Sequence, residues 1–178
     1  MMNQTLRPVS LKNYTTLRAG GSAELFAVCR TVDELADLAI HSQRTDLKTT
    51  YLGSGSNILP SDDGVPGLVV LNVARRLEIG DDGLVKASTG LSFQELFLKS
   101  AQSNFAGLEY AVGIPGTIGG AVVSNAGAYR SSIDEFLTRV EVVMDGKRKW
   151  VEPSILECSY RDSILRLLPD TPLCLLQI

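Results

Sequence analysis

The sequence predicts a mixed α+β fold of helices and strands in two lobes, and three observations support this. Two capping-box patterns, at Thr31 and Ser92, each place a glutamate three residues later and open an apolar stretch with helical spacing. Apolar, β-branched runs alternate with these helices along the chain. Beyond residue 73 the strand-like runs are joined by short Gly-containing turns, which are typical of hairpins. We therefore place a lobe boundary near residues 72–75, which divides the chain into domains 1–72 and 73–178.

The first lobe is predicted to contain a β-α-β unit. A strand over 23–28 precedes the helix, which follows Thr31 and extends to about Gln43 with Leu35, Leu38 and Ala39 on one face. A second strand over 49–52 follows it, and a third, buried strand is expected over 68–72. The second strand would deliver the loop that follows it to one edge of the sheet.

The second lobe is predicted to contain two hairpins and a helix. The hairpin runs are 77–79 with 84–87, and 140–144 with 148–151. The second helix is expected from Ser92 to about Ser103. The apolar stretch from Leu173 to Ile178 is typical of a strand, and we expect it to lack a neighbour. Such a strand would favour self-association or a complementing segment supplied from elsewhere.

Composition excludes several classes of function. The chain has 178 residues, 44% of them hydrophobic, and a net charge of −3, so it has no general attraction for nucleic acid or anionic lipid. The three cysteines form no CxxC pair and there is one histidine, so spacing predicts no metal site. No apolar stretch approaches the length of a membrane span and the first thirty residues lack an apolar leader core, which predicts a cytoplasmic protein with no membrane contact.

The segment from Gly107 to Tyr129, GLEYAVGIPGTIGGAVVSNAGAY, contains six of the chain's 16 glycines. Gly116, Gly119 and Gly120 follow Pro115, whose ring fixes its own φ, so we interpret the segment as a rigid turn. Several free N–H groups on one face of such a turn would suit phosphate oxygens. The alternative is a Gly-rich surface loop that binds nothing.

A second loop, LGSGSNIL at 52–59, follows the predicted strand over 49–52. Gly53 and Gly55 permit unusual backbone conformations, while Ser54, Ser56 and Asn57 add short polar side chains. Together they form a plausible cradle for a pyrophosphate. The loop has neither the lysine of a P-loop nor the third glycine of a dinucleotide fingerprint.

Four motifs together resemble one family, the UDP-N-acetylenolpyruvoylglucosamine reductases, which are also called UDP-N-acetylmuramate dehydrogenases. These motifs are NYTTLRAGGSAELF at 13–26, LGSGSNIL at 52–59, the Gly-rich run at 107–129 and CSYRDS at 158–163. Their order and approximate spacing match the family, whose members are oxidoreductases of bacterial peptidoglycan synthesis and so of cell-wall biogenesis, cell shape and cell division. The family's members are longer, and this sequence ends before their carboxy-terminal third.

The resemblance implies a two-lobed FAD-binding fold of the vanillyl-alcohol oxidase-like (PCMH) type, with FAD held between the lobes. It places the FAD pyrophosphate against 53–57, and the ribityl and phosphate part along Pro115, Gly116, Thr117, Gly119 and Gly120. Asn125, Ala126 and Gly127 would lie near the isoalloxazine. The physical requirement is close backbone approach with many neutral donors, which small residues supply. Alternatively, Asn125 is a turn residue whose side chain bonds its own backbone.

Arg161, in YRDS, matches the family's active-site arginine beside the enolpyruvyl group. In the family NADPH reduces the flavin, and the reduced flavin passes hydride to UDP-N-acetylglucosamine enolpyruvate, which yields UDP-N-acetylmuramate. A fixed guanidinium would stabilise the negative charge that develops on the α-carbon and carboxylate. The alternative is a surface arginine paired with Asp162 or another nearby carboxylate.

The sequence also departs from the family. Ile164, Leu165 and Arg166 follow YRDS where the family has an aromatic residue and a lysine, and neither the family's proton-donating serine nor its late glutamate has a counterpart before Ile178. Two hypotheses remain: an FAD-dependent NADPH oxidoreductase of the reductase family, or a catalytically incompetent FAD-binding module. A related flavoprotein that acts on another substrate is a third, which the presence of YRDS beside both loops disfavours.

Overall fold

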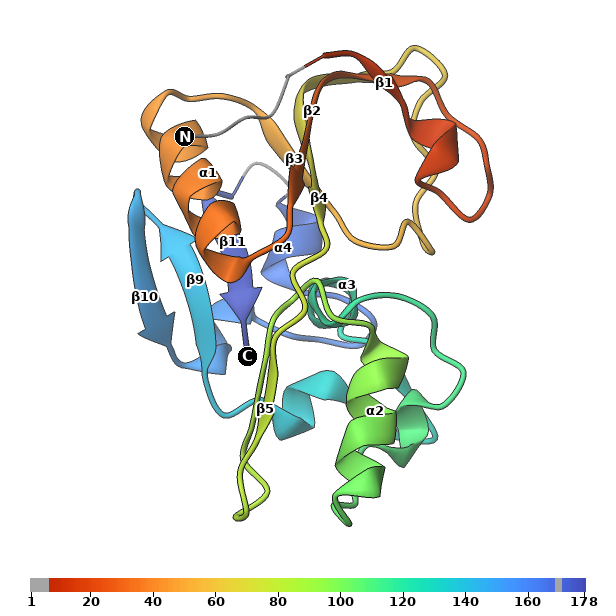
Figure 1. Ribbon diagram of the computed structural model, residues 1–178, viewed down its shortest axis with the longest axis vertical. Coiled ribbons are helices and arrows are strands. Elements are labelled where there is room, and N and C mark those ends of the chain that lie inside the picture. Colours follow the sequence, from red (N-terminus) through yellow and green to blue (C-terminus); the bar gives the residue numbers. More distant parts are fainter. Residues whose placement is uncertain (1–6, 169–170) are drawn as a thin grey trace.

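The first lobe is built on a four-stranded sheet of order β1-β2-β4-β3 (Figure 1). The computed structural model describes residues 7–168 and 171–178. The four strands are β1 (Val9–Ser10), β2 (Ser22–Cys29), β3 (Thr49–Leu52) and β4 (Val65–Asn72). β2 and β3 both run parallel to β4, which lies between them, whereas β1 is antiparallel to β2. The predicted β-α-β unit is confirmed, with β4 inserted as the central strand of the sheet.

Helix α1 (Val32–Arg44) connects β2 to β3 and begins where the capping box predicted. The Thr31 hydroxyl accepts a hydrogen bond from the Glu34 amide at 3.1 Å, which satisfies one of the helix's unpaired N–H groups. The Glu34 carboxylate in turn accepts from the Arg30 amide at 2.7 Å, one residue before the cap. The predicted apolar face, with Leu35, Leu38 and Ala39, is buried.

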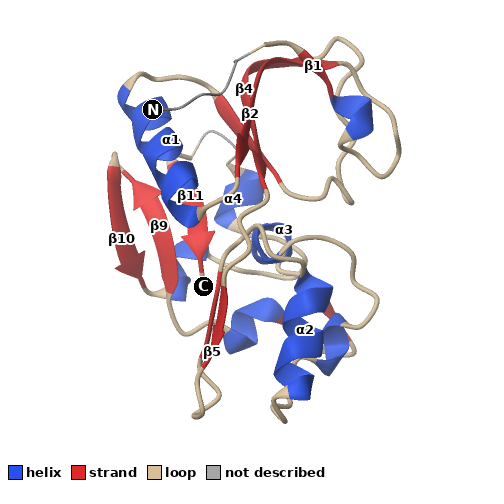
Figure 2. Cartoon of the chain, viewed as in Figure 1, coloured by secondary structure: helices blue, strands red, loops and turns tan. Residues whose placement is uncertain are grey.

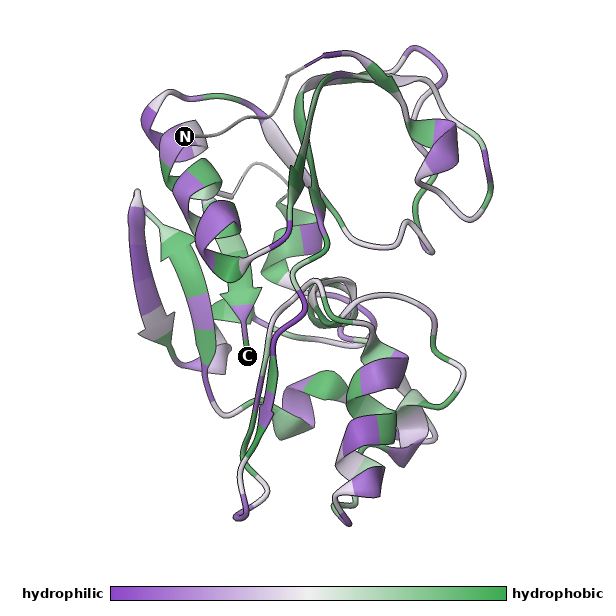
Figure 3. Ribbon diagram, in the orientation of Figure 1, coloured by the Kyte–Doolittle hydropathy of each residue, from purple (hydrophilic) through white to green (hydrophobic). Residues whose placement is uncertain are grey.

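The second lobe contains a three-stranded antiparallel sheet of order β10-β9-β11. Its strands are β9 (Val140–Met144), β10 (Lys147–Val151) and β11 (Leu173–Gln177). Asp145 and Gly146 join β9 to β10 with positive φ at both positions, as a tight hairpin turn requires. Figure 3 shows that β9 and β11 are largely hydrophobic, whereas β10, of sequence KRKWV, is mostly hydrophilic.

The expectation that the last strand lacks a neighbour is wrong. β11 pairs with β9 along one edge. On its other edge Ala87 and Ile178 exchange two backbone hydrogen bonds of 2.9 Å, and the Thr89 amide donates to the Leu176 carbonyl at 3.0 Å. All five residues of β11 are buried. Apolar sequence alone reveals a buried strand, but its partners come from segments that lie about 30 and 90 residues away in the chain.

The remaining elements of the second lobe are short (Figure 2). Strands β5 (Leu77–Ile79) and β6 (Val85–Ala87) form the predicted hairpin, and β7 (Gly127–Ala128) pairs with β8 (Ser131–Ser132). Helix α2 (Phe93–Gln102) begins at its predicted cap, where Ser92 Oγ accepts from the Glu95 amide at 3.4 Å. Two further α-helices are α3 (Ile118–Val123) and α4 (Ile164–Leu167). The 3₁₀ turns of this lobe are η2 (Glu109–Ala111), η3 (Ile133–Phe136) and η4 (Pro153–Leu156), and the first lobe contains η1 (Leu11–Asn13).

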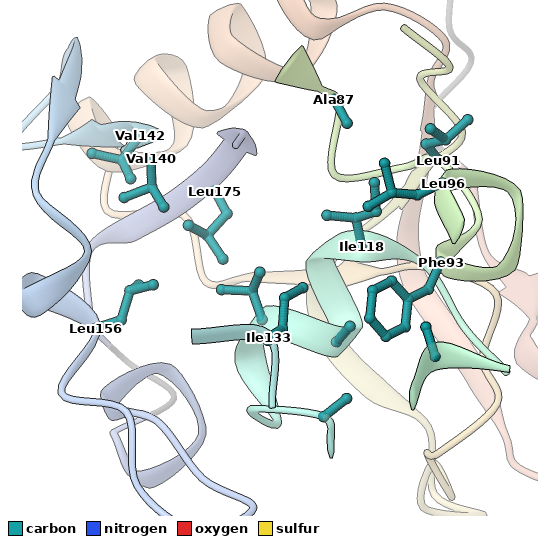
Figure 4. Close-up of a cluster of buried hydrophobic side chains, with 14 of the residues drawn as sticks. Ala87, Leu91, Phe93, Leu96, Ile118, Ile133, Val140, Val142, Leu156 and Leu175 are labelled. Atoms are coloured by element: carbon teal, nitrogen blue, oxygen red, sulfur yellow. The ribbon is translucent and has the colours of Figure 1, made fainter. Parts of the chain in front are cut away.

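Two apolar cores share the sheet of β9 and β11. The α2 core contains Leu173 and Leu175 together with side chains from α2, α3 and β9, several of which are labelled in Figure 4. The α1 core contains Cys174 and Leu176 together with the buried face of α1 and residues of β2 and β4. Alternate residues of β11 therefore face different cores, as the two-residue period of a strand dictates. The α1 core crosses the boundary predicted near residues 72–75, because β9 and β11 pack against α1 of the first lobe.

Within residues 7–168 and 171–178, no helix is both long and apolar enough to span a bilayer.

Candidate functional site

The loop after β3 packs tightly against the segment 14–16. Gly55 has φ +65°, and a Cβ placed on it would lie 2.0 Å from the Tyr14 carbonyl oxygen, so only glycine fits. The Gly55 carbonyl accepts a hydrogen bond from the Thr16 amide at 3.0 Å. Residues 14–16 belong to the motif NYTTLRAGG, so this motif packs directly against the loop in the fold.

The predicted cradle retains its donors. Within the described parts of the chain, the backbone amides of residues 54–57 donate no hydrogen bond. The side chains of Ser54 and Asn57 are exposed, whereas the Ser56 hydroxyl reaches the Pro115 carbonyl at 3.4 Å. Consecutive unpaired amides beside short polar side chains suit the oxygens of a diphosphate.

The two Gly-containing loops lie side by side. A Cβ placed on Gly53 would lie 2.4 Å from Thr117 Oγ1, and one on Gly116 would lie 3.2 Å from Ser56 Oγ. Ser56 and Pro115, which are 59 residues apart in sequence, bring the loop at 53–57 and residues 115–117 together into one surface. Glycine at position 53 is therefore what allows the two loops to pack together, and this packing places the unpaired amides of 54–57 beside residues 116 and 117.

The interpretation of residues 116–120 as a turn with free amides is wrong. Thr117 caps helix α3, and its hydroxyl accepts from the Gly120 amide at 3.3 Å. The amides of Ile118 and Gly119 donate to the carbonyls of Leu91 and Thr89, both at 2.8 Å. Of the amides in this stretch, only those of residues 116 and 117 donate no hydrogen bond within the described chain. A cap and packing against residues 89–91 make this Gly-rich stretch helical, which composition does not reveal.

A pocket of about 270 Å³ lies beyond the carboxyl end of α3. Its lining comprises Asn125, Gly127, Ala128, Tyr129, Arg130, Ser131, Ser132, Tyr160 and Arg161. The fold thus brings three of the predicted residues, Asn125, Gly127 and Arg161, to one place. The predicted Ala126 points elsewhere, since it is 5% exposed and belongs to the α2 core.

Asn125 holds two turns of the pocket together. It is 4% exposed and has φ +40°, a left-handed conformation that asparagine tolerates. Its Nδ2 donates to the Ser159 carbonyl at 2.9 Å, and its Oδ1 accepts from the Asp134 amide at 3.3 Å. The side chain therefore bonds backbone far along the chain, so the alternative in which it bonds its own turn is wrong.

Arg161 lies at the tip of a four-residue turn. Ser159 and Asp162 exchange two backbone hydrogen bonds, at 3.0 and 3.2 Å, and Arg161 has φ +60°. The Asp162 carboxylate accepts from the Ser163 amide, and the Arg161 guanidinium makes no ion pair or hydrogen bond within the described residues. The alternative of a surface pair with Asp162 is therefore wrong.

Ser163 anchors this turn to the end of helix α3. Its side chain is fully buried, and its hydroxyl donates to the Val123 carbonyl, the last of helix α3, at 2.6 Å. One short helix therefore links the two parts of the candidate site: Thr117 at its start touches the cradle loop, and Val123 at its end supports the Arg161 turn. Six residues of α-helix span about 9 Å. This separation suits a diphosphate at one end and the ring of the same cofactor at the other.

Sequence reasoning missed Tyr129 and Arg130, which lie between β7 and β8 and line the same pocket. Both have positive φ, 54° and 71°, although neither is glycine or asparagine. One sequence signal could have identified them, because the pair Tyr-Arg occurs in AYRS and again in SYRD. The two tyrosines, Tyr129 and Tyr160, are 89% and 91% exposed.

Comparison with known proteins identifies both the fold and the relatives. Residues 23–152 match the model of a family described as an FAD binding domain. The chain is 41% identical over 159 residues to the UDP-N-acetylenolpyruvoylglucosamine reductase of Nostoc punctiforme, an alignment that covers 88% of this chain and 48% of the relative. It is 35% identical over 163 residues to that of Bacillus subtilis, with coverage of 88% and 52%. The chain thus spans about half the length of these relatives.

Solved structures of other proteins have a similar fold. The crystal structure of the UDP-N-acetylenolpyruvylglucosamine reductase of Thermus caldophilus superposes with a TM-score of 0.79 at 32% identity, covering 97% of this chain and 60% of that one. An alkyldihydroxyacetonephosphate synthase superposes with a TM-score of 0.58 at 14% identity, covering 75% and 27% of the two chains. These likenesses confirm the predicted PCMH-type fold, and the predicted resemblance to the reductases is confirmed as well.

Proposed function

The chain belongs to the FAD binding domain family, and from that premise we propose that it forms the FAD site and part of the active site of a UDP-N-acetylenolpyruvoylglucosamine reductase. The reaction would be the NADPH-driven reduction of UDP-N-acetylglucosamine enolpyruvate to UDP-N-acetylmuramate, in the cytoplasm, for peptidoglycan synthesis. The names of the relatives support the substrate, and the pocket that contains Arg161 supports the chemistry.

The residues present fit the cofactor. The unpaired amides of 54–57, with the side chains of Ser54 and Asn57, would hold the diphosphate. Gly53 lets the cradle loop pack against Thr117 at the start of α3, and α3 would separate the diphosphate from a ring placed beside Asn125 and Gly127. When bound, FAD supplies the transfer of hydride from NADPH to the enolpyruvyl β-carbon.

Arg161 would act on the substrate through its charge. Hydride addition to the β-carbon develops negative charge on the α-carbon and its carboxylate, and a planar guanidinium can hold that carboxylate through two parallel hydrogen bonds. Arg161 suits this role because no described residue pairs with it and because a turn anchored by Asn125 and Ser163 fixes its backbone. Such fixed donors lower a barrier by several kcal/mol when they face developing charge.

One observation carries the proposal, which is the convergence of separate motifs in the fold. Gly53 contacts Thr117, and Arg161 shares a pocket with Asn125 and Gly127, although these residues come from three separate segments. This convergence places the unpaired amides of 54–57 near one end of α3 and the Arg161 pocket near the other.

The second candidate is an FAD-binding module without turnover. The chain spans about half the length of its relatives. The side-chain hydroxyls that line the described pocket belong to Ser131, Ser132 and the highly exposed Tyr129 and Tyr160. The hydroxyls of Ser131 and Ser132 are already engaged, by Glu135 and Asp134 respectively. On this view no buried, fixed donor of the described pocket protonates the α-carbon, and turnover would need residues from elsewhere.

The first test is the visible spectrum of the chain after addition of FAD and removal of the excess. We expect a retained flavin band at about 450 nm. A folded chain that retains no flavin would refute both candidates.

The second test separates the candidates. Anaerobic NADPH should bleach the bound flavin, and the enolpyruvyl substrate should then restore its colour. Restoration supports the reductase, whereas none above the substrate-free control supports the module. Arg161→Ala should retain FAD and slow the reoxidation, while Arg139→Ala, an exposed arginine outside the pocket, should behave as the wild type.

A further inference from the structure

The pocket beyond α3 is lined by two Tyr-Arg turns. Tyr129 and Arg130 form the tip between β7 and β8, and Tyr160 with Arg161 forms the tip of the turn closed by Ser159 and Asp162. Each tip carries its arginine at positive φ, 71° for Arg130 and 60° for Arg161. The side chain of Asn125 bonds the backbone of both regions, at Ser159 and Asp134.

The charge of the pocket is positive. None of its nine lining residues is Asp or Glu. Like Arg161, Arg130 makes no ion pair or hydrogen bond within the part of the chain that the structure describes. The carboxylates next to these residues in the chain accept hydrogen bonds from neighbouring groups and pair with neither arginine. Glu135 accepts from the Ser131 hydroxyl at 3.1 Å and from the Ser132 amide at 3.2 Å, Asp134 accepts from the Ser132 hydroxyl, and Asp162 accepts from the Ser163 amide at 3.0 Å.

We propose that Arg130 is a second anion-binding residue of this site, which acts with Arg161 to hold one oxyanion of a ligand other than FAD. This inference rests on the proposed function. Two guanidinium groups without protein carboxylates to pair them bind a planar carboxylate or a phosphate with paired, charge-assisted hydrogen bonds. The FAD diphosphate is not the expected occupant, because the unpaired amides of 54–57 lie at the opposite end of α3.

Two sources could supply that oxyanion, the enolpyruvyl carboxylate of the substrate or a phosphate of the nicotinamide cofactor. Their shared chemistry is an oxyanion with at least two oxygens on one side, and bare ions can represent them. Oxalate represents the planar carboxylate, and inorganic phosphate represents the phosphate. The ion that binds more tightly identifies the source.

The test is a titration of the FAD-loaded and the FAD-free chain, labelled with ¹⁵N-arginine, with each ion at constant ionic strength. The Nε–Hε signals of Arg130 and Arg161, assigned with the Arg130→Lys and Arg161→Lys variants, should shift saturably with one shared Kd. Arg130→Ala should raise the Kd measured at Arg161 about tenfold or more, since it removes charge-assisted hydrogen bonds. Arg139→Ala, which removes the same charge outside the pocket, should change it less than about twofold.

Three results would overturn the proposal. These are no saturable shift at Arg130 with either ion, an unchanged Kd in Arg130→Ala, or loss of ion binding when FAD is added, which would make the cofactor itself the occupant. A failure of the proposed function is distinguishable, because it would appear as a chain that retains no FAD, and the arginine signals would still report on the pocket in the FAD-free sample.

Discussion

Asn125 is expected to hold the Arg161 turn in place, and replacing it by alanine tests this role. Asn125→Ala removes a hydrogen bond of 2.9 Å to the Ser159 carbonyl and one of 3.3 Å from the Asp134 amide. It also places an alanine at φ +40°, where asparagine is better tolerated. Asn125→Gly removes the same hydrogen bonds but relieves the backbone, so the two variants separate the two effects.

The expected loss of stability follows from the two hydrogen bonds of Asn125 and from its backbone conformation. Each hydrogen bond contributes about 1 kcal/mol net, and because both backbone groups lie near the surface, water replaces part of what is lost. Left-handed backbone costs an alanine about 1 kcal/mol or more. We expect Asn125→Ala to lower the free energy of unfolding by about 2–3 kcal/mol, and Asn125→Gly by about 1–2 kcal/mol. For a chain of this size the alanine variant should lower the Tm by roughly 4–12 °C.

Urea unfolding measures the free energy, and limited trypsin digestion measures the local effect. Both variants should speed cleavage after Arg161 relative to cleavage after Arg18, an exposed arginine of the first lobe. The reasoning fails if Asn125→Ala unfolds within about 0.5 kcal/mol of the wild type and is cleaved after Arg161 at the wild-type rate.

Three further predictions concern other parts of the chain. Gly55→Ala forces a Cβ to 2.0 Å from a backbone oxygen at φ +65°, so it should cost about 3 kcal/mol or more in urea unfolding and abolish FAD retention. Arg148→Ala removes hydrogen bonds of 2.7 and 3.0 Å to the buried Glu141 carboxylate, and we expect a loss of about 2 kcal/mol. Burial raises the pKa of Cys29 to about 11 and that of Cys174 to about 12, so both thiols should resist iodoacetamide at pH 8, as checked by mass spectrometry.

Each of these has a matched control. Gly113→Ala has φ +77° but no atom within 4 Å of the new Cβ, so it should show only the backbone cost of about 1–2 kcal/mol. The Asp33 side chain, which pairs with Arg148, is 82% exposed. Asp33→Asn removes this exposed ion pair and should cost less than about 0.5 kcal/mol. Cys158 is partly exposed and should be alkylated first, although burial raises its pKa as well. Equal costs for the two glycines or the two ion-pair variants, or equal rates for the three thiols, would contradict the respective argument.

The sequence predicted most accurately those helices and hairpins whose cause lies in neighbouring residues. Thr31 and Ser92 marked the starts of α1 and α2 because a capping side chain bonds an amide only three residues away. The turn at Asp145-Gly146 was predictable for the same reason, since its positive φ values need those residue types. In each case the cause of the structure lies within a few residues of the pattern.

The errors concern contacts between distant segments. Helix α3 was missed because Gly119 and Gly120 are poor helix formers, and the helix exists through its cap and its packing against residues 89–91. The turn at Tyr129 was missed because its residues do not favour positive φ, and the pairing of β7 with β8 holds it there. The motifs marked loops that the fold brings together, but only the fold shows which of their amides are already engaged.

The alternation along β11 has a consequence for how the protein folds. Two of its side chains complete the α2 core and two complete the α1 core, so neither core is closed until this strand has joined β9. Its contacts with α1 join residues separated by about 130 positions, which slows folding because so long a loop must close first. We therefore expect one cooperative unfolding transition for the whole chain in calorimetry. Before β11 docks, the apolar face of α1 is left uncovered, and at that stage the chain is most exposed to aggregation.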